Sequence, residues 1–392
     1  MSRRSMYRTN SARSTTQLGE IPDGHLRDTN GMMTDMDLTT SSRTAPASRR
    51  ENLLTSVFST WLIVGLFVDG WAHNNLAELE TFWTPWHGLF YSGFAATAGW
   101  IVWMIRRRVL AGASLTGAVP EGYRPSVVGL MVFAVGGVGD AIWHTILGVE
   151  TDVDALFSPT HILLVTGIML IVTGPIRSVS RSFPARTVAR GEFLPIGIAT
   201  TLGLLLVAFF TMYSWAPTSG VYQVTFTPNR TGEFEAVFGV LLILVTTMIV
   251  RSALLWLSSR WQVPFGTFTA MLTVIGILMS GMLDEFAQPW EILPAAAAGM
   301  TADLIIRRFD PTPSNVTRWM LFGGAVPLVM WATHFSLFAA FRQLGWTAEL
   351  WGGVPVLAAM TGALLAYLIG YAPPPARVDS EDSEEALATS YR

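Results

Sequence analysis

Ten long apolar runs dominate the chain and leave few folds open to it. A helix needs about 20 apolar residues to cross a bilayer, with a range of about 17–25, and most of the runs have that length. Only 14% of the residues are charged, against about 25% in soluble domains. The sequence therefore predicts an all-α, polytopic membrane helix bundle of about ten transmembrane helices. The runs cover residues 53–72, 84–105, 126–147, 160–175, 193–213, 235–257, 266–283, 290–306, 319–340 and 351–370.

Polar segments flank the apolar region at both ends. Residues 1–50 are rich in Ser, Thr and Arg and lack the hydrophobic stretch that a secretory signal requires. Residues 372–392 contain a run of prolines followed by several acidic residues. Segments of this kind cannot bury enough apolar surface to fold. We predict a disordered cytoplasmic tail at 1–50, a transmembrane bundle at 51–371 and a disordered acidic tail at 372–392.

Arginine placement predicts the orientation in the membrane, because basic loops stay in the cytoplasm. Arginines precede the first run and then occupy alternate connections, whereas the opposite connections carry acidic residues. We therefore expect a multi-pass protein of the cell membrane with both termini in the cytoplasm. The connections assigned to the cytoplasmic side carry Arg106, Arg107, Arg108, Arg124, Arg177, Arg181, Arg186, Arg190, Arg251, Arg260, Arg307, Arg308 and Arg318, and the exceptions are Arg230 and Arg342.

A short pattern occurs twice in the first half of the chain. Residues 68–73 read Val-Asp-Gly-Trp-Ala-His and are followed at 84–87 by Thr-Pro-Trp-His. Residues 139–144 read Gly-Asp-Ala-Ile-Trp-His and are followed at 158–161 by Ser-Pro-Thr-His. Each copy has Asp-x-x-x-His at the outer end of one run and a proline and a histidine at the start of the next. The copies therefore predict a tandem repeat of parallel helical hairpins, at 53–105 and 126–175.

The spacing within each copy suits a metal site. Asp and His four residues apart lie on one helical face. Proline is favoured in the first turn of the returning helix, which places the second His beside the end of the first helix. One carboxylate and two imidazoles with an open position are typical of catalytic metal sites, whereas packing residues or a proton relay are the alternatives. The predicted ligands, near the outer membrane face, are Asp69, His73, His87, Asp140, His144 and His161.

Three further residues are weaker candidates for metal ligands. His334 lies near the outer end of its run, at the level of the two repeats. Three roles are open for it: a ligand, a hydrogen-bonding partner of a ligand or a packing residue. Asp284 and Glu291 flank a Pro-Trp pair that loosely resembles the Pro-Trp-His of the first hairpin. A solvated outer loop is the alternative reading for these two acids.

The composition limits the chemistry of any such site. The chain has no cysteine, which excludes disulfides, thiolate metal sites, iron–sulfur clusters and cysteine nucleophiles. The formal net charge of -3 argues against nucleic acid as a partner. Imidazole suits copper, iron and zinc alike, so the ligand type leaves the metal open.

The second copy of the repeat resembles part of a known enzyme family. Its Asp-x-x-x-His helix end, acidic loop and Ser-Pro-Thr-His helix start are similar to the C subunit of the particulate methane and ammonia monooxygenases, which has Thr-Pro-Ser-His at the second position. The likeness spans roughly residues 65–175, and both hairpins here offer Asp where methane-oxidising relatives have Asn in one. It implies an enzyme that inserts oxygen into inert C–H or N–H bonds. It also implies copper bound within the membrane by Asp140, His144 and His161 and, by the same matching, by Asp69, His73 and His87.

Three interpretations of the function remain open at this point. One of them keeps the sites but changes the metal, because two histidines and one carboxylate also describe non-haem iron oxygenases and zinc hydrolases. A copper-dependent membrane monooxygenase would use O2 and a small or apolar substrate from the lipid bilayer, in surroundings that keep water from the reaction. Such an enzyme could form a homo-oligomer or assemble with companion membrane subunits. A metal or proton transporter, or another metal-handling protein, could use the same clusters, and parallel repeats are common in transporters. The strong candidates lie at one depth, which favours a fixed site over a transport path.

Overall fold

The computed structural model describes residues 45–76, 83–148, 153–182, 186–225, 232–341 and 344–371. The predictions of disorder for 1–44 and 372–392 lie outside these residues. Residues 45–50, which the sequence assigns to the tail, include the start of the first helix. Within the described residues the regular structure is helical, and β pairing is limited to one isolated bridge between Pro46 and Glu121. The predicted all-α helix bundle is therefore confirmed.

The long helices follow the predicted apolar runs closely. Short helices α3 (Leu115–Ala118) and α5 (Asp154–Phe157), and the 3-10 segments η1 (Met212–Ser214), η2 (Ala216–Thr218), η3 (Gly220–Gln223) and η4 (Pro289–Glu291), lie in the connections. The long helices are α1 (Arg49–Asn75), α2 (Pro85–Leu110), α4 (Arg124–Leu147), α6 (Pro159–Val172) with its continuation α7 (Gly174–Ser182), α8 (Arg190–Phe210), α9 (Glu233–Arg260), α10 (Thr267–Asp284), α11 (Ile292–Phe309), α12 (Val316–Phe341) and α13 (Ala348–Tyr371).

Nine helices of the described chain are long and apolar enough to cross a membrane, counting α6 and α7 as one. Among the long helices, α11 is the exception, because its eighteen residues include Asp303, Arg307 and Arg308. Asp303 is nevertheless buried and accepts the backbone N–H groups of Phe268 and Thr269 at the start of α10. This contact satisfies helix N–H groups that would otherwise lack partners. The predicted run at 290–306 is therefore a helix, packed between α10 and α12.

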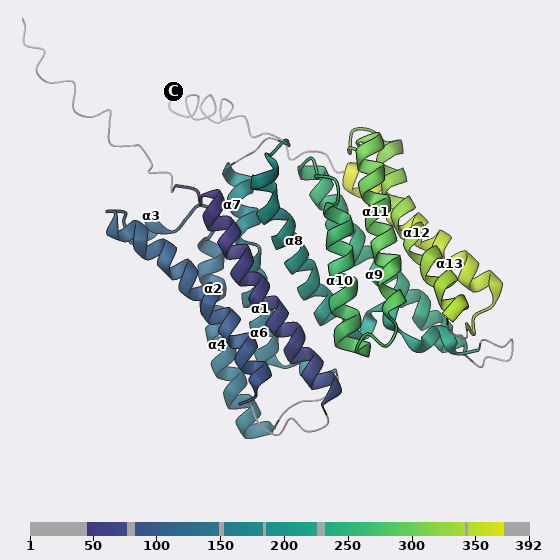
Figure 1. The fold of residues 1–392 in the computed structure, drawn as a ribbon, viewed down its shortest axis with the longest axis horizontal. Helices are drawn as coiled ribbons and strands as arrows, with labels where there is room; N and C mark the ends of the chain where they lie inside the picture. The colour runs from purple at the N-terminus through teal and green to yellow at the C-terminus, as the bar shows by residue number, and fades with distance from the viewer. Residues whose placement is uncertain are drawn as a thin grey trace, which may run out of the picture. The chain divides into compact units, whose positions relative to one another are not determined.

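Neighbouring helices along the chain pack as hairpins (Figure 1). The pairs α1–α2, α4–α6, α10–α11 and α12–α13 make the most extensive contacts. The first two pairs and α8 form the purple-to-teal half of the bundle, and α9 to α13 form the green-to-yellow half. Contacts of α10 with α1 and α8 join the halves. The two hairpins of the sequence repeat therefore belong to the same half.

Glycines set how closely the repeat hairpins pack. A Cβ added at Gly93 of α2 would lie 2.6 Å from the Leu62 Cα of α1. In the second hairpin, a Cβ at Gly129 of α4 would lie 2.7 Å from the carbonyl oxygen of Gly167 in α6. Small residues at such crossings let membrane helices approach closely. The close approach brings the ends of the paired helices, and with them the predicted ligands, within reach of each other.

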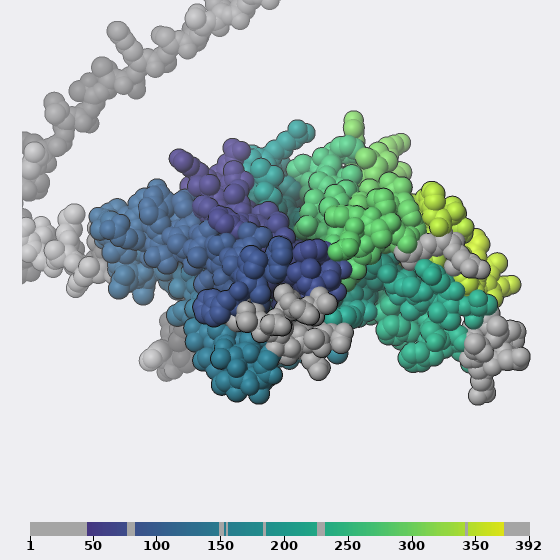
Figure 2. Space-filling view, turned by 60° about the horizontal axis from the view of Figure 1, so that its bottom comes forward, coloured from purple at the N-terminus to yellow at the C-terminus, as the bar shows by residue number. Residues whose placement is uncertain are grey.

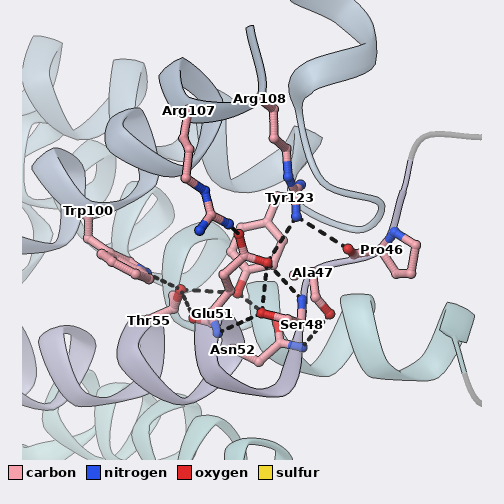
Figure 3. Close-up of polar contacts among 10 residues, drawn as sticks. All are labelled: Pro46, Ala47, Ser48, Glu51, Asn52, Thr55, Trp100, Arg107, Arg108 and Tyr123. Carbon is pink, nitrogen blue, oxygen red and sulfur yellow. Dashed lines mark hydrogen bonds and ion pairs between the residues drawn. The ribbon is translucent and has the colours of Figure 1, made fainter. Parts of the chain in front are cut away.

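An ion-pair network ties the helix ends opposite the predicted ligands (Figure 3). Buried Glu51 of α1 contacts Arg107 at 2.7 Å and Arg108 at 2.9 Å, both from the end of α2. Ser48 caps α1 in a capping box with the same Glu51. Burial raises the pKa of Tyr123, which keeps its hydroxyl protonated to donate to two α1 side chains. The arginine-rich ends of the first two helices are therefore joined to the start of α4.

The sequence assigns Arg251 to a cytoplasmic connection, but in the structure this residue does not flank a turn. It lies well inside α9, is 1% exposed and faces α12. One guanidinium nitrogen donates to the Phe322 carbonyl at 2.9 Å, and the group lies over the Phe322 ring at 4.6 Å. The reason is helix length: α9 continues without interruption to Arg260, and only that residue reaches the end.

Candidate metal centre

The six predicted ligands lie at the same end of four helices. Asp69 and His73 occupy the last two turns of α1, and His87 lies in the first turn of α2. Asp140 and His144 lie near the end of α4, and the sixth ligand, His161, begins α6. These helix ends lie toward the bottom of Figure 1, and Figure 2 turns that side of the molecule toward the viewer. Both hairpins therefore present their histidines at one level.

The first hairpin brings one carboxylate and two imidazoles together. Asp69 Oδ2 lies 3.6 Å from His87 Nε2, and the rings of His73 and His87 are 5.5 Å apart between centroids. One donor atom from each of the three residues falls within 4.8 Å of the others. Carboxylate oxygens and imidazole nitrogens bind a metal ion such as zinc at about 2.0–2.2 Å. The three donor atoms therefore lie close enough together to surround one such ion.

In the second hairpin Asp140 lies close to both imidazoles, but Asp140, His144 and His161 do not together form one of the groups of potential metal ligands among the described residues. Asp140 Oδ1 lies 3.1 Å from His161 Nε2 and 3.5 Å from His144 Nε2. Asp140 is 1% exposed and His144 is 7% exposed, so water reaches this pair poorly. Buried carboxylates need partners, and here both imidazoles supply them.

The two hairpins form one continuous cluster. The rings of His87 and His144 are 6.0 Å apart between centroids, and His87, Asp140 and His144 form a second group of potential ligands that spans both hairpins. All six predicted ligands line a single cavity of about 80 Å³, closed on its other sides by α8 residues such as Phe209. The sequence left open whether the two triads lie together, and the structure places them side by side.

A hydroxyl at each helix start holds the returning histidine in place. Thr84 caps α2: its Oγ1 accepts the His87 backbone N–H at 3.1 Å and lies 3.0 Å from His87 Nδ1. Ser158 caps α6 in the same way, at 3.3 Å from the His161 N and 2.9 Å from Nδ1. A hydroxyl oxygen has two acceptor lone pairs, so it can accept both N–H groups. Each ring then directs Nε2 toward an aspartate, the orientation found in metal-bound histidines.

The two aspartates differ in their hydrogen bonding. Asp140 accepts the Thr160 hydroxyl at 3.2 Å and the Tyr91 hydroxyl at 3.0 Å. Asp69 Oδ1 is buried and has no hydrogen-bond partner among the described residues. The sequence explains the difference, because the repeat has Trp86 where Thr160 stands, and Val165 one turn after His161 where Tyr91 stands one turn after His87. A buried carboxylate oxygen without a partner is costly, and a metal ion would supply the missing contact.

The three weaker candidates do not join this cluster. His334 is fully buried in α12 among aromatic rings, including Tyr222 at 5.2 Å. Asp284 ends α10 and accepts the Ser280 hydroxyl at 2.9 Å, while Glu291 is buried in η4. None of the three lies in the groups of potential metal ligands found among the described residues. His334 therefore packs against aromatic side chains in this fold. Glu291 is buried, so it does not lie in a solvated loop.

Residues outside the repeat complete the cavity. Met212 of η1 and Asn74 of α1 both line it, and the Asn74 amide lies 3.8 Å from the Met212 sulfur. Tyr91 lies one helical turn after His87, so its position beside the ligands follows from the sequence spacing alone. No sequence signal places Met212 there, because it approaches from a helix that is distant along the chain.

A scan against protein-family models, a search of curated proteins and a search of solved structures each found no match to this chain. The fold and the cluster define a polytopic helical membrane protein with a buried Asp/His group that can hold a metal ion.

Proposed function

We propose that this protein is a membrane-embedded, copper-dependent monooxygenase that oxidises a small or apolar substrate with O2. One observation carries the proposal: two aspartates and four histidines from four helices line one buried cavity, with Asp69 Oδ1 left without a partner among the described residues. Structural polar groups in membrane helices are normally paired. A buried set of metal-binding side chains with an unpaired carboxyl oxygen is typical of a metal centre.

The donor set suits copper. The ligands are imidazole and carboxylate groups, and Met212 adds a thioether to the cavity wall. Imidazole binds copper, iron and zinc, whereas soft thioether ligands select copper(I). Copper bound there would supply O2 binding and activation. The two groups of potential ligands share His87, and the resemblance to the C subunit of the particulate monooxygenases implies copper at each hairpin.

The side chains of this chain would position the reactants. Thr84 and Ser158 fix the orientation of two imidazoles, and Tyr91 and Thr160 hold Asp140. Burial of the cluster keeps bulk water away, which protects a reactive oxidant from side reactions. The Tyr91 hydroxyl donates a hydrogen bond to Asp140 Oδ2 at 3.0 Å. An external reductant must supply two electrons for each O2 consumed.

The proposed orientation places the metal centre near the outer membrane face. The arginines of α2 lie at the opposite end of the first hairpin from His73 and His87. Basic helix ends stay in the cytoplasm, so the cluster would face the outside with both termini inside. The bundle presents large apolar side chains on its surface, such as Val135 and Ile142 of α4, which suits lipid or companion membrane subunits.

Elemental analysis of the purified protein tests the proposal. We expect one or two equivalents of copper in the wild type and less than half of that in the variant His73→Ala/His87→Ala/His144→Ala/His161→Ala, which removes all four histidines of the cluster. His334→Ala is the matched control, because it also removes a buried imidazole but lies outside the cluster. Its copper content should equal that of the wild type.

Each other outcome has a distinct meaning. Iron or zinc in place of copper would keep the site and refute the copper chemistry. Equal metal content in all three proteins would refute the ligand assignment. Metal-free protein after reconstitution, with proton or metal flux into vesicles, would replace the monooxygenase by a transporter.

A further inference from the structure

An apolar groove runs along the membrane-facing side of the metal cluster. It lies between α2 and α4, has a volume of about 1050 Å³ and is open on one side. It extends along α2 from Trp83 at the helix start to Phe94, which is roughly 17 Å at 1.5 Å per residue. Binding pockets for small molecules have about 300–1,000 Å³, so this groove is large and elongated.

Two glycines keep the groove open. A Cβ added at Gly88 of α2 would meet no atom within 4 Å, so a larger residue there would occupy the groove itself. A Cβ at Gly137 of α4 would lie 3.0 Å from the Tyr91 ring, so the glycine lets that ring lie against α4. Phe94 and Phe133 stack at 4.0 Å and close the deep end. The residues that line the groove follow the axes of both helices.

The groove and the metal cavity share a wall. His87 lines both spaces. Tyr91 lines the groove, and its hydroxyl donates to Asp140 on the cavity side. A molecule in the outer third of the groove would therefore lie one side chain away from the cluster.

We propose that this groove binds an uncharged molecule with a single linear hydrocarbon chain, which enters from the bilayer and places one end beside His87 and Tyr91. The elongated shape along α2 and α4 suits a linear chain. Among the described residues the lining is apolar apart from Thr84, His87, Tyr91 and Thr145, and it contains no arginine to hold a phosphate. This distinguishes the occupant from a bound phospholipid. Only the role of the occupant as a substrate depends on the proposed function, because the binding itself needs no metal.

Photolabelling in lipid nanodiscs tests the binding site. The probe is a diazirine-bearing dodecanol, added to the metal-free full-length protein, with labelled residues mapped by mass spectrometry. We expect labelling of groove residues that saturates with probe concentration. Gly88→Leu should weaken this labelling by ~10-fold or more, the cost of a misfitting side chain in an apolar pocket.

Gly99→Leu is the matched control. Gly99 also lies on α2, is exposed and has no atom within 4 Å of an added Cβ, but it does not line the groove. This variant should label like the wild type, and both variants should bind metal normally. A saturable site lost only in Gly88→Leu would support the proposal.

Two results would overturn the proposed site. The first is labelling that rises linearly with the probe on all lipid-facing helices and is indifferent to Gly88→Leu. The second is the absence of saturable labelling in the groove of the wild-type protein. Saturable binding of the probe, without oxidation of its hydrocarbon by metal-loaded protein supplied with O2 and a reductant, would support the groove and refute the monooxygenase. Failure of the groove and failure of the proposed function are therefore distinguishable.

Discussion

Ser158 offers a direct test of how the metal cluster is positioned. Its hydroxyl is 2.9 Å from His161 Nδ1 and also accepts the His161 backbone N–H at 3.3 Å. The variant Ser158→Ala keeps all six predicted ligands and removes both contacts. Loss of an N-cap costs about 1 kcal/mol of stability. Loss of the partner that orients a metal-bound histidine costs about 10–100-fold in metal affinity, or about 1.4–2.8 kcal/mol.

Metal affinity is measured by competition with a chromophoric chelator, and thermal unfolding of the same samples reports stability. Ser158→Thr should keep the wild-type affinity, because the first hairpin already uses Thr84 in this role. Ser114→Ala is the control: Ser114 caps the short helix α3 through the Gly117 N–H and does not line the metal cavity. It should lose a cap and no metal affinity. Wild-type affinity in Ser158→Ala would refute the positioning role of the hydroxyl.

Three further perturbations follow from individual contacts. Tyr91→Phe removes the hydroxyl that donates to Asp140, so the free energy of unfolding should fall by about 1–3 kcal/mol. A free energy of unfolding equal to that of the wild type would contradict the contact. Glu51→Gln breaks the ion pairs with two arginines of α2, so the unfolding temperature should fall while metal content is unchanged. Loss of metal would contradict this expectation and show that the network around Glu51 affects the metal cluster at the opposite helix ends. Arg251→Met removes a buried guanidinium with two nitrogens that lack hydrogen-bond partners among the described residues, so stability should stay the same or rise. A marked loss of stability would show that Arg251 is paired more strongly than its contacts indicate.

The local design of each ligand hairpin could be predicted from the sequence. The four-residue spacing of Asp140 and His144 places both on one helical face, and the Ser-Pro start places His161 in the first turn of α6, as the structure shows. These are consequences of helix geometry, which depends on residues close along the chain. The capping hydroxyls were part of the same motif, although their contact with Nδ1 became visible only in the structure.

Other features could not be predicted because they depend on contacts between distant residues. The weaker candidate His334 shares the predicted depth of the cluster, but α12 packs in the other half of the bundle and surrounds this ring with aromatic side chains. Arg251 looked like a residue at a loop, and it became a buried one because α9 continues past it. Depth along a helix can be read from a sequence, whereas the direction that a residue faces in the bundle cannot.

The sequence by itself determined the helical bundle, because ten apolar runs in a bilayer leave helices as the way to satisfy backbone hydrogen bonds. It also determined which six side chains form two matching sets. Only the tertiary structure decided that the sets share one cavity, because α1 of the first hairpin packs against α6 and α7 of the second. It also decided that Tyr91 from the first hairpin supports Asp140 of the second. The physical reason is that hairpin geometry is local, whereas the meeting of two hairpins depends on side-chain packing across the whole bundle.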